Sequence, residues 1–237
     1  MIKRIFDIII SFIGFVVIFP ILLIFSILVW RHDLRSPFYI APRVGKNFKL
    51  FNMVKLRSMV VDADKLEVAS TSNNDKRITP VGHLIRKFKL DELIQLWNVL
   101  IGDMSLVGPR PNVKSEVDLY TEVEKKLLSV KPGITDFSSI VFSDEGKILE
   151  NKENPDLAYN QLIRPWKSRL GLIYIKHQSI LLDIELIIFT LIALLSKPKA
   201  LNWVGQKLEK FKIEKNIIDI AKREVELFPS LPPGSDK

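Results

Sequence analysis

An uncharged apolar run of 23 residues constrains this chain more than any other feature. It extends from Ile8 to Trp30 and consists of IIISFIGFVVIFPILLIFSILVW. Because about 18 consecutive apolar residues already make a membrane helix the default interpretation, the run predicts a membrane-embedded segment. It is too long for the apolar part of a secretory signal peptide, and no Ala-x-Ala-like cleavage site follows it.

Pro20 lies near the middle of this run, with twelve residues before it and ten after it. Proline removes a helical hydrogen bond and kinks or breaks a helix. Two interpretations follow: a kinked helix that crosses the membrane once, or a re-entrant hairpin that enters and leaves the same leaflet. Both ends of the run are flanked by basic residues, so the one-sided charge of a simple crossing is missing. The residues alone leave both interpretations open.

The charge balance and the missing cysteines limit the chemistry. Thirty-five Lys and Arg against 27 Asp and Glu give a net charge of +8, which suits nucleic acid, a nucleotide or an acidic membrane surface. The absence of cysteine excludes disulfide scaffolds, thiolate metal sites and a cysteine nucleophile. The three histidines are far apart in sequence, which excludes a two-histidine helical metal motif.

The rest of the chain predicts short strands among many helices. The expected elements are two strands within 37–59 joined by a turn at 44–47, a helix after Pro80, a helix over 90–100, a turn-rich segment at 102–111, a helix around 113–129, a turn at 132–133 and a loop-like segment at 143–160. Apolar residues return over 174–195, but Asp183 and Glu185 leave only ten uncharged residues after them, so an interfacial or core helix is expected there. An amphipathic helix and a loose tail are expected to follow.

Three clusters of charged residues are candidates for chemistry. Asp91 and Glu92 precede an apolar helical stretch, where carboxylates also simply stabilise a helix N-terminus. Arg110 stands between two prolines, so it is presented from a stiff loop that suits a bidentate phosphate contact, although it is equally compatible with a surface turn. Lys55 and Arg57 alternate on a strand whose basic face is by itself an ordinary solvated surface. Together they predict a site for an anion such as a diphosphate, with a lipid as second substrate beside the membrane segment.

Several motifs occur together in one order along the chain. They are KRIFD at 3–7, the apolar run with its central proline, VKLRSM at 54–59, LDELIQLWNVLIGDMSLVGPRP at 90–111, KPGIT at 131–135 and SILLDIELI at 179–187. Over about residues 1–196 the chain closely resembles the bacterial sugar transferases, which are small monotopic polyprenyl-phosphate phosphoglycosyl transferases.

The resemblance implies an activity and a location. A phospho-sugar passes from a UDP-sugar to undecaprenyl phosphate through a covalent aspartyl intermediate, and UMP is released, as the first membrane step of surface glycan synthesis. The expected partners are therefore a UDP-sugar, undecaprenyl phosphate and membrane phospholipid, with Mg²⁺ as cofactor and no nucleic acid. The expected location is the bacterial inner membrane, with the catalytic domain on the cytoplasmic face.

The resemblance also implies residue roles. Asp91 matches the nucleophile and is the expected Mg²⁺ ligand, with Glu92 assisting it. The predicted catalytic residues are therefore Asp91 and Glu92. The predicted substrate-binding residues match family positions that bind phosphate or lie near the site, and they are Arg110, Lys55, Arg57 and Asp183.

The implied fold is α+β and mostly α, with a re-entrant helix broken at Pro20, a small β element and interfacial amphipathic helices. The expected divisions are a membrane segment and junction at 1–36, a catalytic domain at 37–196, and a C-terminal amphipathic extension at 197–237. The chain departs from the family pattern at Phe19, where many members have serine. It departs again at Asp136-Phe137-Ser138-Ser139, where many continue Gly-Trp-Ala-Gln, and this leaves the sugar open.

Two other function classes account for less of the sequence. A membrane-anchored basic protein that binds nucleic acid or anionic lipid accounts for the charge and the anchor, but gives no reason for the arrangement of Asp91, Glu92 and Arg110. A Rossmann-type glycosyltransferase requires alternating βαβ units and a glycine-rich phosphate loop, which the sequence lacks.

Overall fold

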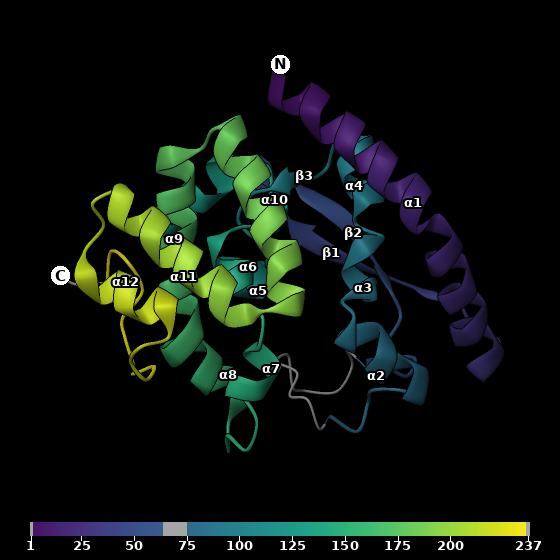
Figure 1. The fold of residues 1–237 in the computed structure, drawn as a ribbon. Helices are drawn as coiled ribbons and strands as arrows, with labels where there is room; N and C mark the ends of the chain where they lie inside the picture. The colour runs from purple at the N-terminus through teal and green to yellow at the C-terminus, as the bar shows by residue number, and fades with distance from the viewer. Residues whose placement is uncertain (1, 64–74, 236–237) are drawn as a thin grey trace.

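A computed structural model of the protein describes residues 2–63 and 75–235. Helices dominate this part of the chain, together with two small two-stranded sheets. In Figure 1 the N-terminal helix α1 (Ile2–Asp33) lies along one side of the molecule, and the C-terminal helices α11 (Lys197–Lys210) and α12 (Lys215–Lys222) lie on the opposite side. The predicted α+β class, mostly α, is confirmed.

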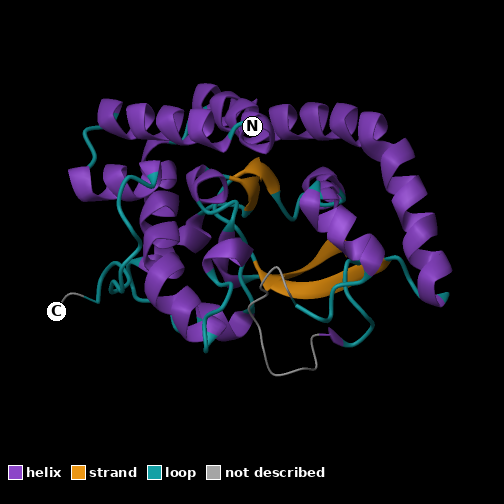
Figure 2. Cartoon of the chain, turned by 60° about the horizontal axis from the view of Figure 1, so that its bottom comes forward, coloured by secondary structure: helices purple, strands orange, loops and turns teal. Residues whose placement is uncertain are grey.

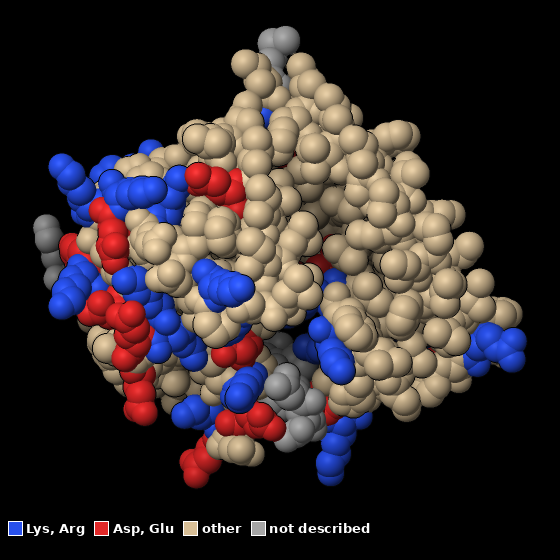
Figure 3. Space-filling view, viewed as in Figure 1, with Lys and Arg blue, Asp and Glu red and all other residues tan. Residues whose placement is uncertain are grey.

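The apolar run lies within α1, a helix of 32 residues that continues through Pro20. Figure 2 shows this helix changing direction part of the way along its length, as expected of a helix with an internal proline. Its buried residues are Asp7, Ser11, Leu22 and Val29, and most of its large apolar side chains are exposed. In Figure 3 the surface over α1 carries almost no charged side chains, whereas Lys, Arg, Asp and Glu gather over α11 and α12. By length and composition α1 is able to lie in a membrane.

Polar contacts bind the first turns of α1 to the body of the protein. Lys3 Nζ donates a hydrogen bond to Asp183 Oδ2 at 2.5 Å. The buried carboxylate of Asp7 accepts hydrogen bonds from Ser105 Oγ at 2.9 Å and from the backbone N–H of Leu106 at 3.2 Å. The KRIFD motif therefore attaches the helix to the folded domain.

The other end of α1 is bound to the same body. Asp33, the last residue of the helix, accepts two hydrogen bonds from the Arg57 guanidinium, at 2.5 and 2.6 Å. At the first end, the Arg4 guanidinium adds hydrogen bonds to the carbonyl oxygens of Val99 and Leu100, at 2.5 and 2.8 Å. Both ends of the membrane-type helix thus contact one folded unit.

The predicted strands form an antiparallel hairpin of β1 (Phe38–Val44) and β2 (Leu50–Leu56), in which Tyr39 pairs with Lys55. The turn between the strands contains a short 3₁₀ segment, Lys46–Phe48. The buried side chain of Asn98 accepts a hydrogen bond from Val54 N–H at 3.0 Å and donates one to the Asn52 carbonyl at 2.8 Å. This amide fixes β2 against the helical segment that follows the acidic pair.

The helices predicted after Pro80 and over 90–100 are present with one interruption. They are α2 (Pro80–Lys87), α3 (Leu90–Leu93) and α4 (Leu96–Ile101). Between α3 and α4 the N–H of Gln95 bonds to the carbonyl of Glu92, which is the tighter three-residue spacing of a 3₁₀ turn. Lys89, with φ of 56°, separates α2 from α3 and places Asp91 and Glu92 in a new first turn.

The prediction of one continuous helix around 113–129 is wrong. The segment contains α5 (Lys114–Val117) and a 3₁₀ helix at Glu124–Ser129. The Glu124 carboxylate accepts a hydrogen bond from Thr121 N–H, and Thr121 Oγ1 accepts one from Glu124 N–H, both at 3.1 Å. This reciprocal capping starts a second helix inside the stretch, and the Thr-x-x-Glu spacing is its sequence signal.

A short parallel sheet, which the sequence did not indicate, joins β3 (Ser105–Val107) to β4 (Gly133–Thr135). A Cβ atom added to Gly133 would lie 2.1 Å from the Gly108 nitrogen, so the two backbones approach closely and neither glycine has room for a side chain. The turn-rich segment at 102–111 and the turn at 132–133 thus cross at these two glycines.

The C-terminal half is helical. Its elements are α6 (Phe137–Val141), α7 (Glu145–Ile148), α8 (Pro155–Ala158), a π-helical turn at Tyr159–Ile163, α9 (Arg164–His177) and α10 (Ile180–Leu195), followed by α11 and α12. The loop predicted at 143–160 therefore holds two short helices, and the single amphipathic helix predicted near the C-terminus is two helices. Leu182 and Leu186 of α10 are buried, whereas Leu181 and Leu191 are exposed.

Helices α11 and α12 belong to the main hydrophobic core. Buried Leu201, Val204 and Leu208 pack in the same cluster as Phe137 and Leu170. The Trp203 ring also stacks on Phe189, with ring centroids 4.2 Å apart. The predicted extension at 197–237 thus supports the wall formed by α6 and α10.

Candidate active site

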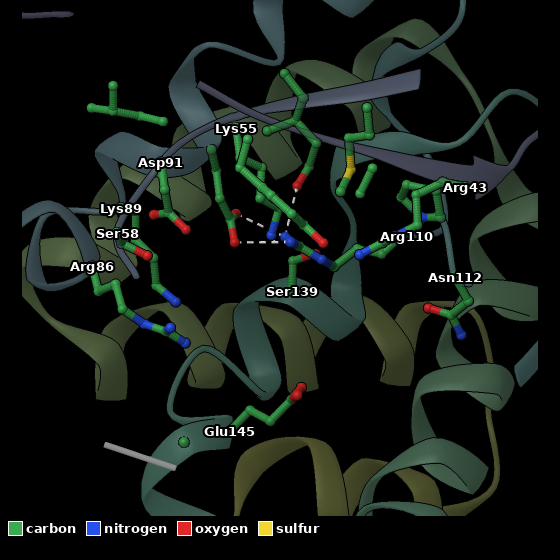
Figure 4. A pocket seen from close by; sticks show the side chains of 18 of the residues that line it. Arg43, Lys55, Ser58, Arg86, Lys89, Asp91, Arg110, Asn112, Ser139 and Glu145 are labelled. Atoms are coloured by element: carbon green, nitrogen blue, oxygen red, sulfur yellow. Dashed lines mark hydrogen bonds and ion pairs between the residues drawn. The ribbon is translucent and has the colours of Figure 1, made fainter. Parts of the chain in front are cut away.

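A cavity of about 2120 Å³ lies between the β hairpin, α2 and α3, the loop after β3, and the segment from α6 to α10. Its walls include Lys55 from β2, Asp91 and Glu92 from α3, Arg110 from the loop after β3, and Glu145 from α7. Figure 4 shows the labelled side chains arranged around this space. The acidic pair, the proline-flanked arginine and Lys55, which are distant in sequence, are therefore neighbours.

Asp91 has a carboxylate oxygen that the protein leaves unoccupied. Its Oδ1 is buried and has no hydrogen-bond partner among the described residues. Burial raises the pKa of Asp91, and the negative charge of Glu92 raises it further, while the cation of Lys55 lowers it. Asp91 lines the charged cavity, so an oxygen that no protein group occupies is available there to a metal ion or to an electrophilic phosphorus.

Glu92 is committed to Arg110. Its two carboxylate oxygens accept hydrogen bonds from Nη1 and Nη2 of Arg110, both at 2.8 Å. Burial opposes ionisation of Glu92, but the guanidinium outweighs this effect and holds the pKa of Glu92 well below its ordinary value. Because a guanidinium has five N–H donors, the contact leaves donors of Arg110 available to a phosphate.

The loop that carries Arg110 is fixed by the parallel sheet. Gly108 N–H donates to the Thr135 carbonyl at 2.9 Å, and Gly133 N–H donates to the Pro109 carbonyl at 3.0 Å. Arg110 Nη1 also lies 3.4 Å from the Ile134 carbonyl. The guanidinium is thus held on a stiff support, as the two flanking prolines predict.

Lys55 and Arg43 extend the basic side of the cavity from one face of the hairpin. Both residues line the cavity. Burial lowers the pKa of Lys55, and the carboxylates of Glu92 and Asp91 oppose that shift. The hairpin therefore presents cations opposite the acidic pair.

Two of the predicted substrate-binding residues have other partners. Arg57 lines the cavity, but its guanidinium pairs with Asp33 and donates from Nε to the Ser36 carbonyl at 2.8 Å. Asp183 is not among the residues that line the cavity: it is buried and accepts hydrogen bonds from Lys3 and from the Tyr174 hydroxyl, the latter at 2.7 Å. In this arrangement both residues attach α1 to the body, Arg57 also lines the cavity while Asp183 does not, and their roles toward substrate stay predictions.

The cavity also contains groups that sequence reasoning missed. Glu145 pairs with Lys167 of α9, and the Lys167 ammonium lies 5.2 Å from the centre of the Tyr159 ring. Asp136 and Ser139 line the same wall. The only local signal was the departure from the family pattern at 136–139, since Glu145 and Lys167 stand in unremarkable polar sequence.

The residues present are compatible with Mg²⁺. No group of three or more His, Asp or Glu side chains forms a ready-made metal site within residues 2–63 and 75–235. Mg²⁺ is commonly bound through one or two carboxylates, with substrate phosphates and water completing its shell. The unpaired Oδ1 of Asp91 supplies one such ligand.

The rim of the cavity is apolar where it approaches α1. Ile18 of α1 and Leu191 and Leu194 of α10 line it, and both leucines are exposed. A polar interior therefore opens toward an apolar, membrane-compatible surface.

The chain is similar in sequence to known bacterial sugar transferases. Residues 1–197 match the family model described as bacterial sugar transferase. The chain is 42% identical over 134 residues to a protein of Bacillus subtilis (strain 168) named as a candidate undecaprenyl-phosphate N-acetylgalactosaminyl 1-phosphate transferase; the match covers 56% of this chain and 71% of that protein.

Two further relatives match a larger share of the chain. Galactosyl transferase CpsE of Streptococcus agalactiae is 36% identical over 200 residues, which cover 80% of this chain and 41% of that protein. The undecaprenyl-phosphate glucose phosphotransferase of Komagataeibacter xylinus is 36% identical over 197 residues, which cover 80% of this chain and 35% of that protein. The chain thus spans less than half the length of these two relatives, and the names of the three mention different sugars.

Proposed function

The chain belongs to the bacterial sugar transferase family, and on that premise we propose that it is a UDP-sugar:undecaprenyl-phosphate sugar-1-phosphate transferase that starts the assembly of a surface glycan. The observation that carries the proposal is the unpaired buried carboxylate oxygen of Asp91 beside the Glu92–Arg110 pair. Such a carboxylate suits a nucleophile, and the adjoining guanidinium suits a phosphate.

The reaction proceeds in two displacements at one phosphorus atom. A carboxylate oxygen of Asp91 attacks the sugar-proximal phosphorus of the UDP-sugar, the bond from that phosphorus to the bridging oxygen breaks, and UMP leaves. A phosphate oxygen of undecaprenyl phosphate then attacks the phosphorus of the aspartyl phospho-sugar. The bond to Asp91 breaks, the carboxylate is restored, and a polyprenyl diphosphate sugar is formed.

The cations around Asp91 support both displacements. Arg110 and Lys55 line the cavity together with Asp91 and would offset the negative charge of a diphosphate bound there, and Glu92 keeps the Arg110 fork in one orientation. Asp91 would also hold Mg²⁺, which neutralises diphosphate charge when it is bound. Arg43, on the same face of the hairpin as Lys55, adds positive charge for the second phosphate-bearing substrate.

The apolar rim supports a lipid acceptor. Undecaprenyl phosphate has an anionic head and a long hydrocarbon chain. The interior of the cavity suits the head, and the rim at Ile18, Leu191 and Leu194 offers the chain a route toward the apolar face of α1.

The first experiment uses the protein without its lipid acceptor. Purified enzyme mixed with a panel of UDP-sugars is expected to release about one equivalent of UMP in a burst, as a covalent intermediate requires. It is also expected to gain the mass of one phospho-sugar on the peptide that contains Asp91. Adding undecaprenyl phosphate is expected to restore continuous turnover. If UMP appears only after the acceptor is added, the covalent route is wrong and direct transfer replaces it.

The attachment of both ends of α1 to one body supports a re-entrant, monotopic arrangement. A helix whose first turns and last residue contact the same folded unit cannot place those ends on opposite sides of a bilayer while that unit stays intact. We further propose, as the family resemblance implies, that the catalytic domain lies at the cytoplasmic face of the inner membrane, with α1 entering and leaving one leaflet and α10 lying at the interface.

Single cysteines at positions 2 and 36 test this topology, because the natural chain contains no cysteine. We expect a membrane-impermeant thiol reagent to label both positions from the cytoplasmic side of inverted vesicles and neither position from the periplasmic side. Labelling of the two positions from opposite sides would show that α1 crosses the membrane. Asp118→Cys, at an exposed position of the catalytic domain, marks the cytoplasmic side.

The pH dependence of donor use follows from the shifted pKa of Asp91. Attack requires the ionised carboxylate, so kcat/KM for the UDP-sugar is expected to fall as the pH falls through the raised pKa of Asp91, above the range of an ordinary aspartate. Glu92→Gln removes the negative charge that raises this pKa, so the acid limb is expected to move to lower pH. Lys55→Met removes a cation that lowers it, so the limb is expected to move to higher pH. Shifts of the opposite sign in the two variants would contradict the assignment of the limb to Asp91.

A further inference from the structure

Asp136 forms part of the cavity wall at the point where the chain departs from the family pattern. It follows β4 directly and caps the short helix α6. Its Oδ1 accepts three hydrogen bonds: from Ser138 Oγ at 2.7 Å, from Ser139 N–H at 2.8 Å and from Ser139 Oγ at 2.9 Å. The helix-capping contacts of Asp136 thus use only one of its two carboxylate oxygens.

The second oxygen has no partner. Oδ2 of Asp136 is buried and accepts no hydrogen bond from any described residue, although the side chain as a whole is only 1% exposed. Burial raises the pKa of Asp136 in spite of the three donors on Oδ1, so the buried charge is under-compensated. Buried polar atoms in native proteins are almost always paired, and an exception beside a ligand cavity calls for a partner.

Two cations that line the cavity with Asp136 are paired with other carboxylates. Arg110 bonds to Glu92, and Lys167 bonds to Glu145. Among the described residues no donor reaches Oδ2, and because Asp136 lines the cavity, a molecule bound there is in a position to supply one. Arg110 also lies beside Ile134, two residues before Asp136, and both charged residues line the same cavity, so one molecule can contact both of them.

The chemistry of a sugar nucleotide narrows the contact. Its phosphates carry only acceptors at neutral pH, whereas hydrogen-bond donors occur on sugar hydroxyls, on the amide of an acetamido sugar, on the ribose and on the uracil ring. Because no described protein group donates a hydrogen bond to Oδ2, this oxygen favours substrates that carry such a group. A substrate without it leaves the buried oxygen unpaired.

We propose that Oδ2 of Asp136 accepts a hydrogen bond from a hydroxyl or amide N–H of the sugar nucleotide and thereby helps to decide which donor the enzyme uses. The inference rests on the proposed function and assigns a residue to the recognition of the donor. It also gives a reason for the departure at 136–139, since Asp136, Ser138 and Ser139 form one unit that holds the carboxylate in place.

Asp136→Asn is the informative variant. The asparagine keeps an oxygen for the three donors that Oδ1 accepts, and Asn154 already caps α8 in this chain by accepting from Leu157 N–H. At the position of Oδ2 it places an N–H₂ group, so two hydrogen-bond donors, one from the protein and one from the substrate, face each other and no hydrogen bond forms. We expect kcat/KM for the best UDP-sugar of a panel to fall about tenfold or more, as for a lost hydrogen bond to a charged group. Asp136→Ser, which keeps a capping oxygen and removes the second one, is expected to show the same loss.

Two measurements, discrimination among UDP-sugars and inhibition by UMP, show whether the group that donates the hydrogen bond to Oδ2 belongs to the sugar or to the nucleoside. If the contact is to the sugar, Asp136→Asn reduces discrimination among UDP-sugars while UMP inhibits both proteins equally. If the contact is to the nucleoside, inhibition by UMP weakens and all UDP-sugars slow by one common factor. Either pattern supports the proposal. Damage to α6 alone would lower the rate with every donor without weakening inhibition by UMP.

The remaining outcomes overturn the proposal. If wild-type enzyme releases UMP and Asp136→Asn keeps its donor preference and its UMP inhibition, the inference fails and the proposed function stands. A uniform loss of rate with unchanged UMP inhibition also refutes it, since that is the signature of structural damage. If wild-type enzyme binds none of the UDP-sugars, the proposed function and the proposed role of Asp136 are both wrong. Asp118→Asn, which removes an exposed carboxylate outside the cavity, is the matched control and is expected to leave every value unchanged.

Discussion

Asp91→Asn is expected to reduce UMP release from a UDP-sugar by at least about 1,000-fold, because the amide oxygen cannot displace UMP from phosphorus. Membrane association should be unchanged, since Asp91 lies in α3 and the exposed apolar surface belongs mainly to α1 and α10. The measurement is UMP release with undecaprenyl phosphate present, together with the fraction of protein recovered in membranes.

The thermal stability of this variant separates loss of chemistry from loss of fold. Burial and the charge of Glu92 raise the pKa of Asp91 above its value in the unfolded chain, so the ionised side chain destabilises the folded state at neutral pH. Asp91→Asn is therefore expected to unfold at the same temperature as the natural protein or a higher one. A large drop in Tm would mean that the lost activity reports on folding.

A conservative replacement grades the effect. Asp91→Glu keeps a carboxylate but displaces it by one methylene, roughly 1 Å from its position, and a misplacement of that size costs about 100-fold. Activity is thus expected to rank natural protein, glutamate variant and asparagine variant in that order. Full turnover by Asp91→Asn would contradict the covalent role.

Arg110→Ala is expected to lower kcat/KM for the UDP-sugar by about 100-fold or more, because it removes a preorganised donor at the phosphate site. It also leaves the Glu92 carboxylate without its guanidinium beside a second carboxylate. Arg110→Lys is expected to recover only part of the loss, since an ammonium supplies a point charge in place of a planar fork. The measurement is steady-state UMP release over a range of UDP-sugar concentrations.

The stability of the Arg110 variants tests the pair itself. Both partners are partly buried, with 27% and 19% of their side chains exposed, so removing one leaves a poorly solvated charge. Arg110→Ala is expected to lower Tm, and adding Glu92→Gln to it is expected to restore Tm without restoring activity. Recovery of activity in the double variant would show that Arg110 acts only by neutralising Glu92. Arg169→Ala, on α9 outside the cavity, is the matched control for the loss of an arginine.

Much of the fold could be predicted because its signals are local. The hairpin, α2, and most of α3 and α4 follow from alternation, from Pro80 at the start of a helix and from apolar spacing. The continuous helix expected around 113–129 failed because the reciprocal bonds of Thr121 and Glu124 start a new helix there. The parallel pairing of β3 and β4 had no local signal, since both strands are three residues long.

The candidate site was predicted in part for the same reason. Asp91, Glu92 and Arg110 stand in compact motifs, and the fold brings them to one cavity with Lys55. Arg57 and Asp183 also stand in motifs, but their charges meet Asp33 and Lys3 and serve the attachment of α1. A charged residue in a motif does not reveal its partner, because that partner comes from a distant part of the chain.

The membrane segment, the family and the acidic pair follow from the amino-acid sequence, because each is written in adjacent residues or in the order of motifs. The tertiary structure alone decided which charges meet. The crossing of β3 and β4 at Gly108 and Gly133 brings Arg110 near Ile134, and Asn98 holds β2 against α4. Charge pairs and unpaired oxygens depend on distances of a few ångströms between segments far apart in sequence, and packing of the whole chain sets those distances.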